Sequence, residues 1–227
     1  MENIVRVLST LALMGAVRGL AGRYQAAAGV RIDADFAPTL GLLDRLRGGE
    51  NADVIILTKQ ALDDLANQGA VVADSCVDLA RSFVGIAVKA GADHPDIATE
   101  PALRAALLDA RVAYSRIGAS GIFFAALIER MGIAGEVNAR ARIIPSGLTA
   151  ELVVTGEADL AVQQLSELKL VAGIEVVGPI PRHLQTPAVF SAGRLAASER
   201  AVQSGALLKY LASPEAAPAL RDSGLEP

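Results

Sequence analysis

Asp53-Val54-Ile55-Ile56-Leu57-Thr58 is an uninterrupted apolar run that opens with an aspartate and closes with a threonine. A run without polar alternation is typical of a strand covered on both faces, as in parallel sheets. Two earlier strands are predicted over residues 4–8 and 30–36. A helix is expected after each of the three strands, over residues 13–28, 40–47 and 59–67. This alternating order predicts a parallel sheet with helices on both faces.

A second set of alternating elements begins at residue 84. The predicted strands of this set are residues 84–88, 111–114, 141–144, 159–162 and 174–177, and its predicted helices are residues 101–110, 121–131 and 147–155. A strand at residues 188–190 and helices at residues 198–212 and 214–222 are expected to return to the first set. We therefore expect an α/β protein with two parallel-sheet-based lobes joined by a two-strand hinge. Lobe I would be residues 1–82 plus 189–227, and lobe II residues 83–188.

One short sequence occurs in similar form in both halves. Gly49-Glu50-Asn51-Ala52-Asp53 resembles Gly156-Glu157-Ala158-Asp159, and each precedes an apolar strand. A glycine in this position allows the left-handed turn that ends a helix before a short reversal of the chain. The repeat favours a duplicated architecture.

Composition excludes several classes of protein. The chain has 227 residues, of which 52% are hydrophobic and 20% charged, so it is expected to fold into a globular protein. A net charge of −4 and an aromatic content of 4% argue against binding to nucleic acid. The single cysteine, Cys76, excludes an internal disulfide and is interpreted as a buried thiol.

The chain contains no apolar stretch long enough for a membrane span. Residues 7–17, with Arg6 before them and Ala26-Ala27-Ala28 after them, superficially imitate a signal peptide. The same residues are needed for the first strand and helix, so no signal peptide is predicted. The expected location is periplasmic if a leader was removed before Met1, and otherwise cytoplasmic.

No motif for covalent, redox or metal chemistry is present. His94 and His183 have no second histidine at ligand spacing, so neither a metal site nor a cofactor is expected. The chain also lacks a G-x-S-x-G elbow, a Walker loop and a dinucleotide fingerprint. No catalytic residue can be named from these patterns.

The first predicted sheet has polar residues where its strands end: Ser9-Thr10, Pro38-Thr39 and Thr58. Ligands of open α/β sheets bind beyond the carboxyl ends of the strands. Hydroxyls and free N–H groups at the start of a helix attract anions. We therefore expect these residues to bind a small anion.

The second half supplies further candidates. Arg116 precedes Ser120-Gly121, which begins a helix, and Gln163-Gln164 ends an apolar strand, while Arg81-Ser82 lies just before the crossing between the lobes. Arginine can grip a carboxylate through two hydrogen bonds. Simpler interpretations remain open. Thr10, Ser120 and Ser146 would then be helix caps, Arg116 a solvent-facing residue, and Arg81 part of a structural salt bridge.

The chain resembles the substrate-binding proteins of ABC transporters, specifically the type II periplasmic-binding fold and its molybdate-binding-like branch. The likeness covers nearly the whole chain and depends on the order and spacing of short landmarks. These landmarks are Ser9-Thr10, residues 51–57, residues 84–91, residues 152–159, Phe190-Ser191-Ala192-Gly193 and residues 223–227. The resemblance implies a hinged, two-lobed protein that closes on a small anion, with the membrane component of an ABC transporter as an expected partner.

The sequence departs from this branch at the residues that bind molybdate. Where molybdate binders have Ser-Ser-Gly, a serine and a tyrosine, this chain has Pro38-Thr39-Leu40, Leu57-Thr58 and Gln163-Gln164. The departures favour an organic di- or tricarboxylate over molybdate. Three functions remain open: a binding protein, a cofactor-free isomerase of an unsaturated tricarboxylate similar to aconitate isomerase, and an interaction module, which no sequence feature supports.

Overall fold

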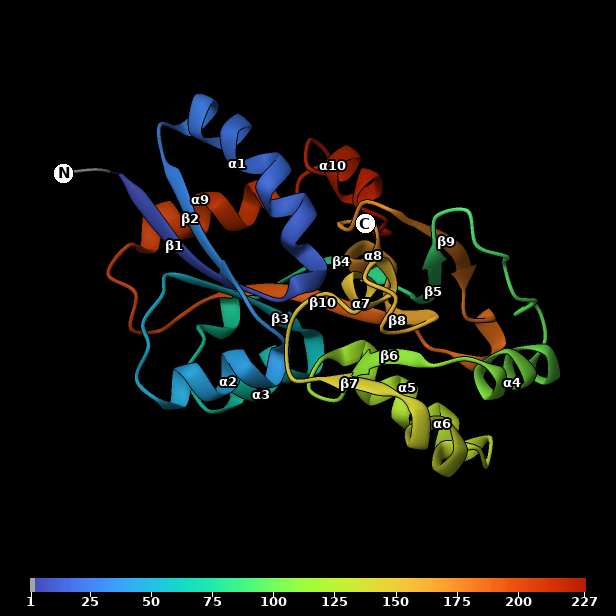
Figure 1. Cartoon of the computed structure of the whole chain (residues 1–227). Coiled ribbons are helices and arrows are strands. Elements are labelled where there is room, and N and C mark those ends of the chain that lie inside the picture. Colours follow the sequence, from blue (N-terminus) through green and yellow to red (C-terminus); the bar gives the residue numbers. More distant parts are fainter. Residues whose placement is uncertain (1–2) are drawn as a thin grey trace. The chain divides into compact units, whose positions relative to one another are not determined.

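The computed structural model describes residues 3–227, which form two compact units. Unit 1 comprises the chain up to Ser82 and again from Ala188, and unit 2 comprises Phe83–Pro187. Each unit contains a five-stranded sheet with helices packed on it (Figure 1). The predicted α/β class is therefore confirmed.

Unit 1 contains the sheet β2-β1-β3-β10-β4. Its strands are β1 (Ile4–Ser9), β2 (Arg31–Phe36), β3 (Val54–Thr58), β4 (Val77–Ser82) and β10 (Ala188–Arg194). Its helices are α1 (Met14–Ala28), α2 (Thr39–Arg47), α3 (Lys59–Asn67), α9 (Ala201–Leu211) and α10 (Ala217–Asp222). Strands β1, β2 and β3 are parallel, whereas β10 is antiparallel to both β3 and β4.

Alternating side chains of β3 face opposite layers of unit 1. Ile55 and Leu57 belong to an apolar cluster with residues of α2 and α3, such as Leu42 and Leu62. Ile56, which points to the other face because strand side chains alternate, is also fully buried. The continuous apolar run of β3 is explained by this cover on both faces.

Helix α1 packs through the predicted apolar stripe. Val17, Leu20 and Tyr24 are buried, although Ala28, at the end of the stripe, is exposed. The ring of Tyr24 lies 4.9 Å from that of Tyr210 in α9, centroid to centroid. Helices α9 and α10 contact β10 and α1 respectively, so the C-terminal helices return to the first unit, as predicted.

Unit 2 contains the sheet β7-β6-β8-β5-β9. Its strands are β5 (Val84–Lys89), β6 (Val112–Ser115), β7 (Arg142–Ile144), β8 (Leu160–Gln164) and β9 (Ile174–Pro179). Its helices are α4 (Glu100–Asp109), α5 (Ala119–Arg130), α6 (Ala134–Arg140), α7 (Ala150–Val154) and α8 (Leu165–Leu168). Strands β6, β7 and β8 are parallel, and β5 is antiparallel to its neighbours β8 and β9.

Some sequence predictions about the elements are wrong. Both sheets are mixed, not purely parallel. Strand β10 in unit 1 and strand β5 in unit 2 are antiparallel to the strands on either side of them. Among the strands and α-helices of the described residues, three were not predicted: β4, α6 and α8. Helix α7 begins at Ala150 instead of Gly147, because Gly147 adopts a left-handed backbone (φ 99°) that cannot continue into a helix.

The repeated sequence in the two halves forms the same structure in each unit. Gly49 and Gly156 both have positive φ, 86° and 81°. The carboxylate of Asp53 accepts a hydrogen bond from the backbone N–H of Arg6 (2.8 Å), and that of Asp159 accepts one from the backbone N–H of Arg111 (2.7 Å). In each case the aspartate N–H also donates to the carbonyl of the same arginine, at 2.8 Å. The repeat thus fixes the register of β3 against β1 and of β8 against β6.

Candidate functional site

The polar strand ends of unit 1 lie along one edge of its sheet. Ser9 pairs with Phe36, just before Pro38, and Thr58 pairs with Phe190. Ser82 ends β4 at the same edge, where it pairs with Ala188. The structure therefore brings together Ser9, Thr10, Pro38, Thr39, Thr58 and Ser82 along this edge.

The hydroxyls of Ser9 and Thr10, at the end of β1, are both buried but differ in their hydrogen bonds. The Ser9 Oγ donates to the carbonyl of Thr10 at 3.0 Å, while the Thr10 backbone N–H donates to the carbonyl of Ile56 at 3.0 Å. The Thr10 Oγ1 has no hydrogen-bond partner among the described residues, although Thr10 is only 3% exposed. Thr10 stands before the short helix Leu11–Leu13, yet its side chain makes no capping bond. The interpretation of this side chain as a helix cap is therefore wrong.

Helices begin at this edge without side-chain caps. Pro38 precedes α2 and Thr58 precedes α3, and neither side chain accepts a hydrogen bond from the first turn. The first turns of α1, α2 and α3 contain no acidic residue. The positive ends of these helices are therefore available to an external anion.

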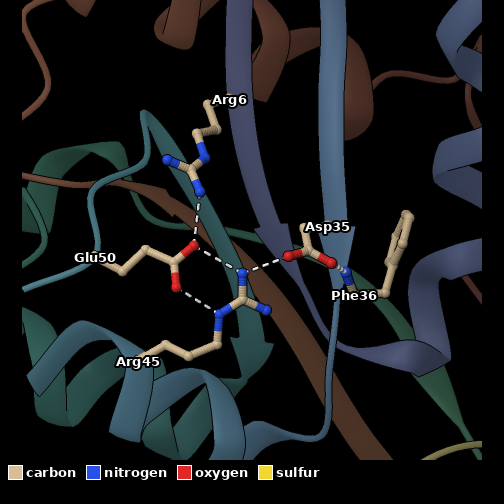
Figure 2. A network of polar contacts seen from close by, with 5 residues as sticks. All are labelled: Arg6, Asp35, Phe36, Arg45 and Glu50. Atoms are coloured by element: carbon tan, nitrogen blue, oxygen red, sulfur yellow. Dashed lines mark hydrogen bonds and ion pairs between the residues drawn. The ribbon is translucent and has the colours of Figure 1, made fainter. Parts of the chain in front are cut away.

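An ion-pair network fixes the turn that carries Pro38 and Thr39. Arg45 of α2 bonds with Asp35 of β2 and, at 2.6 Å, with Glu50, which also accepts a bond from Arg6 at 2.7 Å (Figure 2). The second oxygen of Asp35 accepts the backbone N–H of Phe36 at 2.8 Å. The Arg45 side chain, through its hydrogen bonds, lowers the pKa values of Asp35 and Glu50. The network ties α2 to the end of β2.

The two candidates at the end of β4 have different surroundings. Arg81 is exposed and lines a hollow of about 310 Å³ beside Asp78 and Val189, so it does not lie buried among apolar residues as expected. Its backbone exchanges two hydrogen bonds with Glu226, at 2.7 and 2.8 Å. Ser82 is 1% exposed, and its Oγ has no partner in the part of the chain that the structure describes. Ser82 therefore resembles Thr10 in having a hydroxyl free for a ligand.

In unit 2 the corresponding edge is formed by the ends of β6 and β8. Gly121, in the first turn of α5, packs directly on β6, since a Cβ atom at Gly121 would lie 1.2 Å from the Ser115 carbonyl oxygen. Only glycine permits this contact. Ser120, 4% exposed, is inside α5 and not at its cap, which is Gly118, so its expected capping role is wrong.

Arg116 follows β6 and is exposed. Its Nε donates to the Tyr114 hydroxyl at 3.2 Å, and this hydroxyl in turn donates to the side-chain carbonyl of Asn138. The rest of the guanidinium makes no hydrogen bond within the described residues. The tyrosine thus orients a cation whose outer N–H groups remain available.

Gln163 has an internal role. Its Oε1 accepts from the backbone N–H (2.8 Å) and the hydroxyl (3.0 Å) of Thr149, and its Nε2 donates to the Gly147 carbonyl at 3.1 Å. Thr149, not Ser146, is the residue that precedes α7, so the expected cap at Ser146 is wrong. Gln163 therefore connects β8 to the start of α7.

A carboxyl group that the sequence analysis missed lies at the end of β8. Gln164 precedes α8, and Ser166 and Glu167 belong to the first turn of this helix. They are 1%, 2% and 7% exposed, and the Gln164 Oε1 and Ser166 Oγ have no partners among the described residues. An acidic residue three positions after a strand end, between two leucines, was the available signal in the sequence.

The Glu167 carboxyl is unusual in its ionisation. Burial raises its pKa from 4.5 to about 8, while hydrogen bonds from the Gln164 backbone and the Gln163 side chain only partly oppose the rise. A carboxyl with this pKa is mostly protonated at neutral pH and can donate a hydrogen bond.

The remaining reactive side chains lie elsewhere. Cys76 is partly buried, not fully buried as predicted, and burial raises the pKa of its thiol. His94 pairs with Glu175 at 3.0 Å on the surface of unit 2. Within residues 3–227, no cluster of three histidine, cysteine or acidic side chains forms a metal site, and no helix has the length and apolar character needed to cross a membrane.

Comparison with known proteins was made at the level of sequence and of structure. Residues 5–226 match the family described as bacterial extracellular solute-binding protein. The chain is 42% identical to an aconitate isomerase from a Pseudomonas species, over 97% of this chain and 87% of that protein.

Similar folds occur in solved anion-binding proteins. The periplasmic molybdate-binding protein of Azotobacter vinelandii has a TM-score of 0.82 at 17% identity, covering 97% of this chain and 98% of that one. The sulfate-binding protein of Mycobacterium tuberculosis has a TM-score of 0.80 at 15% identity, covering 99% and 87%. At these identities the likeness establishes the fold alone, and it agrees with the molybdate-binding-like resemblance seen in the sequence.

Proposed function

The chain belongs to the bacterial extracellular solute-binding proteins, and on that premise we propose that it binds a small organic di- or tricarboxylate at the strand ends described above. The observation that carries the proposal is the edge of unit 1, where uncapped helix starts without acidic residues lie beside the unpartnered Thr10 hydroxyl. Buried polar groups without partners cost stability, so a ligand that supplies the missing hydrogen bonds is favoured.

The residues support a carboxylate better than a metal oxyanion. Gln163 is committed to Thr149, and Gln164 replaces the tyrosine of molybdate binders. Arg116, oriented by Tyr114, offers N–H groups in the planar arrangement that matches a carboxylate. Carboxylates spaced along a carbon skeleton suit donors distributed over several strand ends.

A thermal-shift screen tests this proposal. Molybdate, sulfate, phosphate, succinate, citrate, tricarballylate and trans-aconitate would each be added to the full chain. We expect the largest rise in melting temperature with a tricarboxylate. A rise with molybdate or sulfate alone would contradict the proposal.

Arg116→Ala sharpens the test. If Arg116 clamps a carboxylate, its loss weakens binding by about 2 kcal/mol, measured by titration calorimetry. Arg104→Ala is the matched control, because Arg104 is an exposed arginine on α4 of the same unit. Equal affinity of the two variants would remove Arg116 from the site.

A second candidate function is isomerisation of the bound tricarboxylate. The specific observation in its favour is the 42% identity to an aconitate isomerase over nearly the whole chain. In such a reaction a base removes a proton from the carbon next to the double bond, the double bond moves, and a proton returns to the other end of the three-carbon unit. The reaction consumes no cofactor and requires only carboxylate clamps and acid–base groups.

Proton NMR of trans-aconitate in deuterated buffer separates the two functions. Incorporation of deuterium, or the appearance of the cis isomer, would establish catalysis. A ligand that binds and remains unchanged would leave the chain a binding protein, either feeding a transporter in the membrane or acting as a soluble sensor. The location of the protein, periplasmic or cytoplasmic, would differ accordingly.

A further inference from the structure

Glu167 is a buried acid that the proposed binding function does not use. It is 7% exposed in the first turn of α8, immediately beyond the carboxyl end of β8. The Gln164 backbone and the Gln163 side chain lower its pKa, but burial, which raises it, outweighs both. A glutamate at this helical position commonly caps the helix while remaining in solvent. In this protein it is enclosed.

No opposite charge compensates for this burial. Helix α8 packs mainly on β5, β8 and β9, and it shares an apolar cluster with α7, whose only charged residue, Glu151, is exposed. Strand β8 has no charged residue, and the charges on the other two, Lys89 and Glu175, lie at the far end of the sheet from α8, where Lys89 pairs with Ile174 and Glu175 with Val88. Lys169, just beyond α8, has its own partner, and no charge contributes to the ionisation of Glu167. The neutral, protonated form is therefore favoured by the surroundings.

Two neighbouring polar atoms give this turn the capacity to bind a ligand. The Gln164 Oε1 and the Ser166 Oγ are buried, and neither has a hydrogen-bond partner in the described part of the chain. Both residues are more than nine-tenths buried. Polar atoms in this condition are normally satisfied by a ligand or an ordered water. The carboxyl of Glu167 thus belongs to a turn at the end of β8 that has unused hydrogen-bonding capacity.

We propose that Glu167 couples anion binding to proton uptake: the site binds its carboxylate ligand only with Glu167 protonated. This inference rests on the proposed function. A carboxylate ligand near the end of β8 would repel an ionised Glu167, so ligand and ionised Glu167 exclude each other. The protonated carboxyl, in contrast, is compatible with a polyanion.

The test measures affinity against pH with tricarballylate, a saturated tricarboxylate that has no double bond to move. For the wild-type chain we expect constant affinity between about pH 6.5 and 7.5, and a loss approaching tenfold per pH unit above about pH 8, because one proton must then be taken up on binding. The Glu167→Gln variant has a side chain with the shape of a protonated glutamate that cannot ionise. Its affinity for tricarballylate should be independent of pH over this range. Glu151→Gln, a change of an exposed acid in α7, should retain the wild-type slope.

Proton uptake can also be counted without a variant. Calorimetry of wild-type binding near pH 8.5 in two buffers of different ionisation enthalpy should give about three-quarters of a proton taken up per ligand. A count near zero, or a wild-type affinity that does not change with pH, would overturn the coupling while leaving the proposed function intact. A Glu167→Gln variant with the wild-type slope would also overturn it. Absence of tricarboxylate binding at every pH would instead refute the proposed function.

Discussion

The two units have equivalent sheets but different polar ends. Their sheet orders, β2-β1-β3-β10-β4 and β7-β6-β8-β5-β9, correspond strand for strand. The same Arg–Asp backbone contacts set the register in both, through Asp53 and Asp159. In unit 1, however, strands β1, β3 and β4 end in hydroxyl side chains, whereas β8 of unit 2 ends in two amides followed by a buried acid.

This difference shows which residues specify the framework and which specify the ligand. The shared contacts involve backbone groups at the start of the strands, where the two sequences resemble each other. The residues after the strands are free to diverge because they do not hold the sheet together. Chemical specificity in this fold is therefore expected at the strand ends, and the four predictions that follow test the two kinds of residue separately.

The largest effect on stability is expected at Gly121, where α5 packs directly on β6. Gly121→Ala places a Cβ against the Ser115 carbonyl oxygen, 1.2 Å away, so α5 must move from β6. We expect a loss of about 3 kcal/mol or more in the free energy of unfolding. In α6, Gly135→Ala meets no atom within 4 Å and should be neutral or stabilising. Chemical denaturation compares the two, and equal stabilities would contradict the close packing.

The buried acid of unit 2 should make stability depend on pH near neutrality, a range in which the shifted carboxylates Asp35 and Glu50 of unit 1 do not titrate. Because the folded pKa of Glu167 is about 8, above its ordinary value of 4.5, its contribution to stability is full below about pH 4.5 and is lost as the pH rises through 8. The free energy of unfolding should fall by on the order of 3 kcal/mol between these values.

Glu167→Gln should abolish this slope, as measured by denaturation at about pH 5 to 8.5. Carboxylates with lowered pKa values, such as Asp35, act in the opposite direction only at more acidic pH. A variant that retained the wild-type slope would show that Glu167 is not the group responsible.

The two aspartates that set the register, Asp53 and Asp159, should contribute different amounts to the free energy of unfolding. Asp53 is 13% exposed in its side chain and also accepts a bond from Ser198 at 2.7 Å, whereas Asp159 is 45% exposed. Asp53→Ala is expected to cost about 2 kcal/mol and Asp159→Ala about 1 kcal/mol, because a hydrogen bond is worth more where water is excluded. Thermal unfolding measures both. The reverse order would show that burial does not control these contacts.

The smallest effect on stability is expected at the hydroxyls that have no partner. Thr10→Val should change the free energy of unfolding by less than about 1 kcal/mol, since no hydrogen bond of Thr10 Oγ1 is lost. Binding of a tricarboxylate should nevertheless weaken by about tenfold if the hydroxyl bonds with the ligand. Unchanged affinity would make Thr10 part of the framework. Ser9→Ala, which removes an internal hydrogen bond, is the control for the effect on stability.

The sequence predicted most of the framework because the patterns that specify it are local. The apolar run of β3 and the helix Lys59–Asn67 were predicted with the observed bounds or nearly so. Strand β4 was missed because it alternates poorly, and its pairing partners, β10 and Glu226, lie more than a hundred residues away in the chain. Helix α8, with only four residues, is too short to show a helical period.

For the site, the sequence by itself determined which polar residues follow the strands. Only the tertiary structure decided which of them have partners: Gln163 is taken by Thr149, while Gln164 and Thr10 are left with unpaired atoms. The same holds for Glu167, whose pKa depends on its enclosure by α8 and neighbouring strands. Hydrogen-bond partners and exclusion of water arise from residues distant in the chain, and a local sequence pattern contains no record of them.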